Sequence, residues 1–184
     1  MSGSKNKFSL TGIRGGFAVI VSLVFVGVQI RENNRATMSA MASSIADSTT
    51  AWYVELGNNE QSSAMFYHYL ADPNSLSAEE RFQAAMNLHG LFLIFQNSYY
   101  LANEGTLELS ILHSLTEAIV GVKDQPGFQL FWMQRRSIFL EGFQEYVDTL
   151  LTSDRKVSEG MFFGTNELPT NKAINSPAAQ AGTH

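Results

Sequence analysis

The sequence has no cysteine and only four prolines in 184 residues. A chain without cysteine cannot form structural disulfides or cysteine-based zinc sites, although it fits both the cytoplasm and an oxidising periplasm. Strand signals are also missing, because no segment of convincing length alternates apolar and polar residues with a period of two. These absences favour an all-α fold without covalent cross-links.

Clusters of positive charge are scarce as well. Three of the twelve lysines and arginines precede residue 15, which leaves nine against all seventeen aspartates and glutamates in the rest of the chain. A surface that binds nucleic-acid phosphates needs grouped lysine and arginine side chains. We therefore predict no nucleic-acid partner.

Signatures of catalysis are the third absence. The chain has no glycine-rich phosphate loop and no G-x-S-x-G nucleophile elbow. The pairs His68/Asp72 and His113/Glu117 are each four residues apart and could contribute to a metal site. Helical di-metal bundles use Glu-x-x-His motifs, however, and no histidine here has a glutamate three residues before it. We predict surface ion pairs instead, no enzyme, and no catalytic, cofactor-binding or metal-binding residues.

The feature that is present is a long apolar run at residues 8–30, with lysines before it and arginines after it. As a helix it would be about 34 Å long, enough for a bilayer core of about 30 Å. Its one internal charge, Arg14, lies near the start and can reach the headgroups. The sequence predicts a basic tail over residues 1–7 and a transmembrane helix over residues 8–30 that contacts the lipid bilayer.

An alternative interpretation of this run is a cleaved signal peptide, with Ala40-Met41-Ala42 as the cleavage site. Three charged side chains separate the run from that site, which is a poor match for a short neutral cleavage region. An uncleaved, single-pass anchor is therefore favoured. Three basic residues before the run and two after it leave the side of the membrane that holds the helical domain unresolved.

Residues 31–151 are predicted to form a bundle of about five helices that continues from the membrane helix. Met38, Ile45 and Trp52 are spaced by seven residues and form a sparse apolar stripe. The stripe either packs on the chain's own later helices, which we favour, or forms a homo-oligomeric coiled coil. Gly57 is expected to end this first helix.

Local signals also mark the later helices. Ser77 and Glu80 fit a capping box at the start of a helix, and Pro126 suits the first turn of another. Gly90, inside the apolar helix that follows Ser77, is predicted to be a point of close packing. The composition from residue 152 to residue 184 predicts a disordered tail, in which Met161–Phe163 is an apolar patch that docks on the chain itself or on a partner.

Five segments resemble an uncharacterised family of small bacterial single-span membrane proteins, in which a Q-I-R-x-N-x-R-A sequence ends the membrane helix. The similar segments, which occur in the same order, are Gln29–Thr37, Asp72–Phe82, Phe95–Tyr100, Pro126–Phe128 with Trp132, and Phe143–Asp148. The resemblance covers about residues 18 to 150. It implies a helical protein anchored in the bacterial inner membrane, and it carries over no catalytic residue and no cofactor.

We consider three hypotheses for function. The first is a non-enzymatic interaction or scaffolding role near the membrane, with a protein partner or a second copy of the chain. Its candidate contacts are aromatic, because aromatic side chains dominate contact energies; they are Trp52, Tyr99, Tyr100, Phe128 and Trp132, each of which could instead be buried in the core. The second is a sensor or binding module for a small apolar or amphipathic ligand. The third is a metal-dependent enzyme.

Overall fold

The protein was analysed as a computed structural model that describes the backbone of residues 10–157 and the side chains of residues 19–157. The predicted basic tail at residues 1–7 and most of the predicted disordered tail, with Met161–Phe163, lie outside the described residues.

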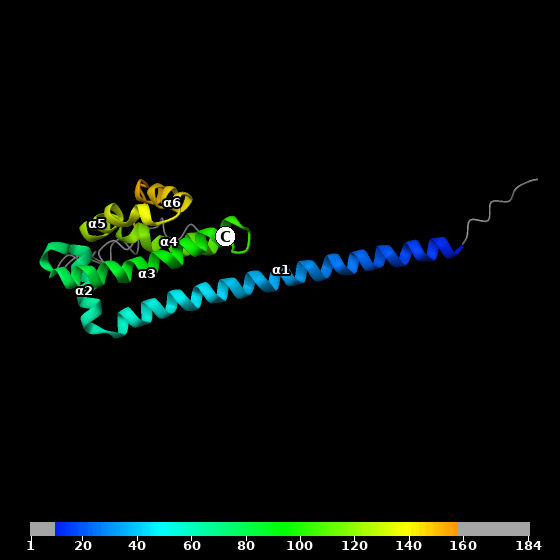
Figure 1. Ribbon diagram of the computed structural model, residues 1–184, viewed down its shortest axis with the longest axis horizontal. Helices are drawn as coiled ribbons and strands as arrows, with labels where there is room; N and C mark the ends of the chain where they lie inside the picture. The colour runs from blue at the N-terminus through cyan, green and yellow to red at the C-terminus, as the bar shows by residue number, and fades with distance from the viewer. Residues whose placement is uncertain (1–9, 158–184) are drawn as a thin grey trace, which may run out of the picture.

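The described chain is all-α, as the sequence predicts, and contains no strand. It consists of a long helix followed by five shorter ones, which pack on one another and on the end of the first (Figure 1). The helices are α1 (Leu10–Asn58), α2 (Glu60–Ala71), α3 (Ala78–Asn103), α4 (Leu109–Val122), α5 (Pro126–Arg135) and α6 (Glu141–Leu151). Short 3-10 helices at Pro73–Ser75 and Arg136–Ile138 complete the order.

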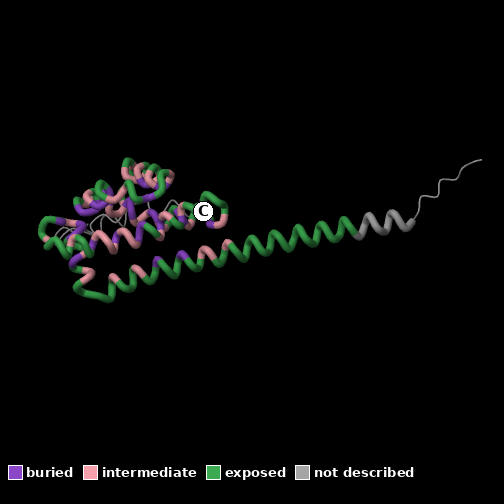
Figure 2. The backbone as a smooth tube through the Cα atoms, in the orientation of Figure 1, coloured by how far each residue is buried: buried purple, intermediate pink, exposed green. Residues whose placement is uncertain are grey.

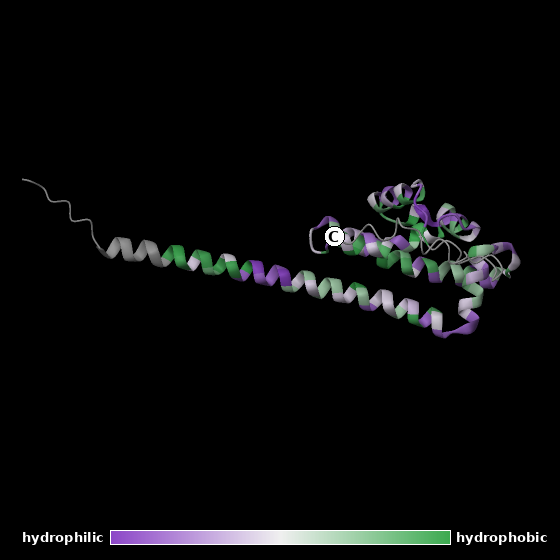
Figure 3. Ribbon diagram, turned by 180° about the vertical axis from the view of Figure 1, so that it is seen from behind, coloured by the Kyte–Doolittle hydropathy of each residue, from purple (hydrophilic) through white to green (hydrophobic). Residues whose placement is uncertain are grey.

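Helix α1 has two parts with different surroundings. It contains 49 residues, which gives a length of about 73 Å. Its C-terminal part lies beside α3, whereas the preceding part extends away from the bundle and is exposed on all sides (Figure 2). Figure 3 shows the extended part as a hydrophobic stretch followed by a hydrophilic one. None of the described helices combines the length and the apolar character that crossing a membrane requires. The span over residues 8–30 therefore stays a prediction.

The apolar stripe of α1 packs on the chain's own later helices, which confirms the interpretation that we favoured. Ile45 and Thr49 are only 4% and 8% exposed. Trp52 packs against the main core, and its indole Nε1 donates a hydrogen bond to the carbonyl oxygen of Asn87 on α3, at 3.0 Å. Ala42, further from the end of the helix, contacts a small cluster at the far end of α3. The contact between α1 and α3 is thus more than two helical turns long.

The ends of the helices follow local sequence signals. The side chain of Ser77 accepts a hydrogen bond from the Glu80 amide, and Glu80 returns one from the Ser77 amide, so the predicted capping box is confirmed. Pro126 begins α5, also as predicted. After α3 the chain turns at Gly105, whose φ of 71° is a conformation that favours glycine.

Aromatic side chains fill the core between α2, α3, α5 and α6. Phe92 of α3 lies at its centre and is 1% exposed. Its ring is within 6.2 Å, between ring centroids, of six other aromatic rings, which are Phe95, Phe128, Phe131, Trp132, Phe139 and Phe143. Offset and edge-to-face pairs of this kind add to the stabilisation that burial provides.

Close packing occurs at a different glycine from the predicted one. The prediction for Gly90 is wrong, because a Cβ added there would have no neighbour within 4 Å. At Gly127, in contrast, a Cβ would lie 1.8 Å from the carbonyl oxygen of Tyr69. The start of α5 therefore rests directly on the backbone of α2.

Candidate functional site

An apolar cavity of about 400 Å³ lies between the C-terminal end of α1 and helices α2 to α5. This volume is within the range of about 300–1,000 Å³ that is usual for small-molecule sites. Its lining consists of 17 residues, which are Trp52, Tyr53, Leu56, Gly57, Ser63, Phe66, Tyr67, Leu70, Leu88, Leu91, Phe92, Phe95, Ala118, Ile119, Gly121, Val122 and Phe128.

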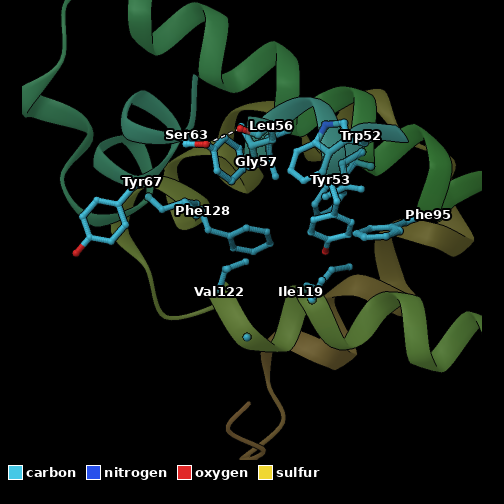
Figure 4. A pocket seen from close by; sticks show the side chains of 17 residues that line it. Trp52, Tyr53, Leu56, Gly57, Ser63, Tyr67, Phe95, Ile119, Val122 and Phe128 are labelled. Carbon is cyan, nitrogen blue, oxygen red and sulfur yellow. Dashed lines mark hydrogen bonds between the residues drawn. The ribbon is translucent and has the colours of Figure 1, made fainter. Parts of the chain in front are cut away.

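The walls of the cavity come from helices that are distant in sequence. Ile119 and Val122 of α4 approach it from one side, next to Phe128 of α5, and the ring of Tyr53 on α1 points across it toward Ile119 (Figure 4). Phe128 and Ile119 are 0% and 1% exposed, so this floor belongs to the rigid core. Tyr53 and Tyr67 are 48% and 40% exposed and mark the mouth.

The lining contains few polar groups, and none of the 17 side chains is charged. The indole Nε1 of Trp52 already donates to Asn87, and the Ser63 hydroxyl donates to the carbonyl oxygen of Leu56. The apolar surroundings of Tyr53 raise the pKa of its phenol, which therefore stays neutral at ordinary pH. The cavity thus offers hydrocarbon surface and the neutral hydroxyl of Tyr53, which points across it toward Ile119.

This arrangement favours binding over chemistry. A general acid or base must be within hydrogen-bond reach of the reacting group, and the cavity has no carboxylate, imidazole or amine in its lining. An ionised ligand group would lose its hydration there without gaining a partner. The site therefore suits the apolar part of a ligand, with any polar head at the mouth.

The five predicted contact residues occupy three kinds of position. Trp52 and Phe128 line the cavity. Trp132 is buried, with its Nε1 donating to Asp148 at 2.9 Å, and Tyr99 packs against the core. Tyr100 is 52% exposed on α3. The sequence thus identified two residues of the cavity, Trp52 and Phe128, but predicted them to be contacts with a partner.

Most of the cavity was not predicted from the sequence. Tyr53, Leu56 and Ala118 carry no motif, and they reach one space only because α1 and α4 both pack on α3. The one available signal was the adjacent pair Trp52 and Tyr53 at the end of a long helix, whose rings lie 5.1 Å apart between centroids.

The histidines form no metal site in the part of the chain that the structure describes, where no group of three or more potential ligands is close enough together. His68 and His113 lie on α2 and α4. In place of the predicted pair His113/Glu117, Glu117 accepts a hydrogen bond from Arg155 at 2.7 Å.

Comparisons with known proteins identify no family for this chain. No family model matches the chain, and neither does a curated protein or a solved structure. The fold and the cavity therefore define only a class, an all-α protein with an apolar interhelical cavity next to a long protruding helix.

Proposed function

We propose that this protein is a membrane-attached helical module that binds a small apolar or amphipathic ligand in the cavity between α1 and helices α2 to α5. The observation that carries the proposal is the cavity itself, which is apolar throughout and free of charged side chains. Such a lining favours a hydrocarbon body, and the exposed edge of the cavity beside Tyr53 and Tyr67 leaves a polar head in water. The protein acts here by binding and not by catalysis.

Attachment to a membrane is supported by the extended part of α1. Nine large apolar side chains between Val19 and Ile30 are all about half exposed or more, and they surround the helix. Soluble monomers rarely expose a contiguous apolar surface of this kind. From Leu10 to Ile30 the helix has 21 residues, about 32 Å at 1.5 Å per residue, which is close to the thickness of a bilayer core. We infer that lipid covers this surface, as expected for a bacterial inner-membrane protein.

The test uses the full chain in membranes and a photoreactive fatty alcohol that carries a diazirine. After irradiation and digestion, we expect labelled peptides from residues 52–57 and 118–122, because they line the cavity, and from residues 10–30, because these contact lipid. Ala118→Phe should fill the cavity and abolish labelling of residues 52–57 and 118–122. The matched control is Ser114→Phe, at an exposed position on the same helix.

The two parts of the proposal fail separately. Labelling of residues 10–30 alone, unchanged by Ala118→Phe, would overturn ligand binding and leave membrane attachment. For attachment, Val24→Lys should release the chain from membranes, because a charge at mid-span costs about 2.5–3.5 kcal/mol. Asp47→Lys, exposed further along α1, is its control. Equal retention of both variants would overturn attachment by this segment.

A second candidate function is interaction with a protein partner or with a second copy of the chain, as a scaffold near the membrane. It is favoured by the outer face of α3, where Phe82, Leu93 and Tyr100 are exposed. Their spacings of 11 and 7 residues place them on one side of the helix. If this face joins two copies, Leu93→Ser should lower the native mass of the full chain in mild detergent, and Gln83→Ser should not.

A further inference from the structure

The last described residues of the chain run along α4, which forms one wall of the cavity. After α6 ends, the Lys123 ammonium donates to the carbonyl oxygen of Ser153, and Arg155 forms an ion pair with Glu117. Gly121, one turn after Glu117 and on nearly the same side of α4, already lines the cavity. The chain therefore passes within about one helical turn of the cavity lining before Val157, the last residue that the structure describes.

The sequence that follows supplies an apolar segment at a suitable distance. Met161-Phe162-Phe163 is the one run of three large apolar residues after Leu151, and Gly160 and Gly164 flank it. Three residues lie between Val157 and Met161, and the four Cα–Cα steps that join them can span about 14 Å when extended. Around an α-helix that is about 10–12 Å across with its side chains, a third of the circumference is about 10–13 Å, so this reach is enough to pass from the Glu117 side of α4 to the cavity.

The chemistry of the segment and of the cavity also matches. The two phenylalanine rings and the methionine side chain carry no charge, and the cavity has no charged side chain that could compensate one. Methionine adapts to irregular apolar gaps and contacts aromatic rings favourably. The cavity offers such rings in Trp52, Phe66 and Phe95.

We propose that Met161–Phe163 docks in the cavity of its own chain and competes there with the ligand. The inference rests on the proposed function, because it assigns that same site an internal competitor. A segment tethered this closely is present at an effective concentration in the millimolar range, so weak docking is sufficient. If the docked segment leaves the cavity free in about one-tenth of the molecules, the apparent affinity for the ligand falls about tenfold.

Docking is measured first, without any ligand. The natural chain has no cysteine, so pairs of cysteines can be introduced into the full chain without side reactions. We expect Phe162→Cys to form a disulfide with Tyr53→Cys, at the mouth of the cavity, on mild oxidation. The matched control pairs Phe162→Cys with Thr149→Cys, which is exposed on α6 and closer in sequence to the segment. Equal or faster cross-linking to position 149 would overturn docking in the cavity.

Competition is measured next with the photoreactive fatty alcohol. Phe162→Ser with Phe163→Ser should increase labelling of residues 52–57 and 118–122 about tenfold at low probe concentration, if docking is as strong as assumed above. Asn171→Ser with Lys172→Ser, further along the tail, should leave labelling unchanged. Labelling that the double serine variant does not increase would overturn competition.

The two experiments separate this inference from the proposed function. Cross-linking of Phe162→Cys to Tyr53→Cys together with no labelling of the cavity in any variant would support docking and overturn ligand binding. Strong labelling without preferential cross-linking would support ligand binding and overturn docking.

Discussion

The carbonyl oxygen of Tyr69 leaves no room for a side chain at residue 127. A Cβ there would lie 1.8 Å from this oxygen and 2.6 Å from its carbon, and both atoms belong to backbone that cannot rotate away. Gly127 therefore sets how closely α5 approaches α2, and with it the position of Phe128 on the floor of the cavity. Gly90, inside α3, has no such neighbour.

Replacing Gly127 by alanine should therefore destabilise the protein by about 3 kcal/mol, because α5 must move away from α2. Thermal unfolding of the full chain, followed by circular dichroism, would measure the change. The matched control, Gly90→Ala, should instead stabilise the protein by about 0.5–1 kcal/mol, since alanine favours a helix interior. Equal effects of the two substitutions would contradict this account of the contact.

His89 is a second residue whose surroundings determine its chemistry. Its ring lies 5.1 Å from that of Phe139, between centroids, and its Nδ1 is buried without a hydrogen-bond partner among the described residues. Burial, and to a lesser degree the positive charge of Arg135, lower the pKa of the imidazole. The folded protein therefore favours the neutral form.

This lowered pKa predicts how stability depends on pH. Below about pH 6.5 the unfolded chain binds a proton at His89 before the folded chain does. Stability should therefore be complete above this pH and decrease as the pH falls toward the lowered pKa. His89→Gln should flatten the decrease, measured by urea unfolding between pH 7 and pH 5. His113→Gln, at an exposed position, is the control, and a profile that His89→Gln leaves unaltered would contradict the prediction.

At the scale of single elements, short sequence signals determine where helices begin and end. Ser77 precedes α3 and caps it through a capping box, whereas Glu108, which precedes α4, provides no side-chain cap. Pro126 and Gly105 act at the start of α5 and in the turn after α3. Ser77, Gly105 and Pro126 act through neighbours within a few residues, so sequence patterns can identify such positions. The predicted boundaries at Ser77 and Pro126 are confirmed for this reason.

The capping box makes a measurable contribution to the stability of α3. Ser77→Ala removes the acceptor for the Glu80 amide and should lower the free energy of unfolding by about 1 kcal/mol. Gln83→Ala, at an exposed position nearly two turns further along α3, should change it little, because alanine fits a helix well. Denaturant titration of the full chain distinguishes the two. A loss for Gln83→Ala as large as that for Ser77→Ala would show that the cap is not the cause.

At the scale of the whole molecule, the contacts between α1 and α3 determine how the bundle is oriented relative to the extended part of α1. Ala42 contacts the turn that follows α3, and Trp52 contacts the middle of α3. The rise along α1 places Ala42 about 18 Å beyond Ile30, and Gly57 at the cavity about 40 Å beyond it. The two ends of the bundle therefore lie at different distances from the apolar part of α1 (Figure 1).

This geometry predicts a difference in depth if the apolar part of α1 lies in a bilayer. Asn103 and Asn74 are exposed near opposite ends of α3, whose 26 residues are about 39 Å long. A fluorophore on Asn103→Cys should be quenched by spin-labelled headgroups more strongly than one on Asn74→Cys. The same pair in the Val24→Lys variant is the control, and it should show no difference. Equal quenching in the unaltered chain would contradict the orientation.

The sequence by itself determined the features that depend on local chemistry. The absence of strand periodicity, the caps and the apolar periodicity of the helices were sufficient for the all-α fold and for most helix boundaries. The stripe at Ile45 and Trp52 also indicated that α1 packs on later helices, because a helix must bury its apolar side against something.

Only the tertiary structure decided which surfaces meet. The contact at Gly127 and the cavity between Tyr53, Ala118 and Phe128 join residues that are up to 75 positions apart, and no local pattern encodes such distances. The same holds for the aromatic residues, since the core around Phe92 hides Phe128 and Trp132 but leaves Tyr100 exposed. Hydrophobic burial is not directional, so the apolar composition requires a core but does not say which residues form it. The packing of side chains in the folded protein decides which residues enter the core and where a cavity remains.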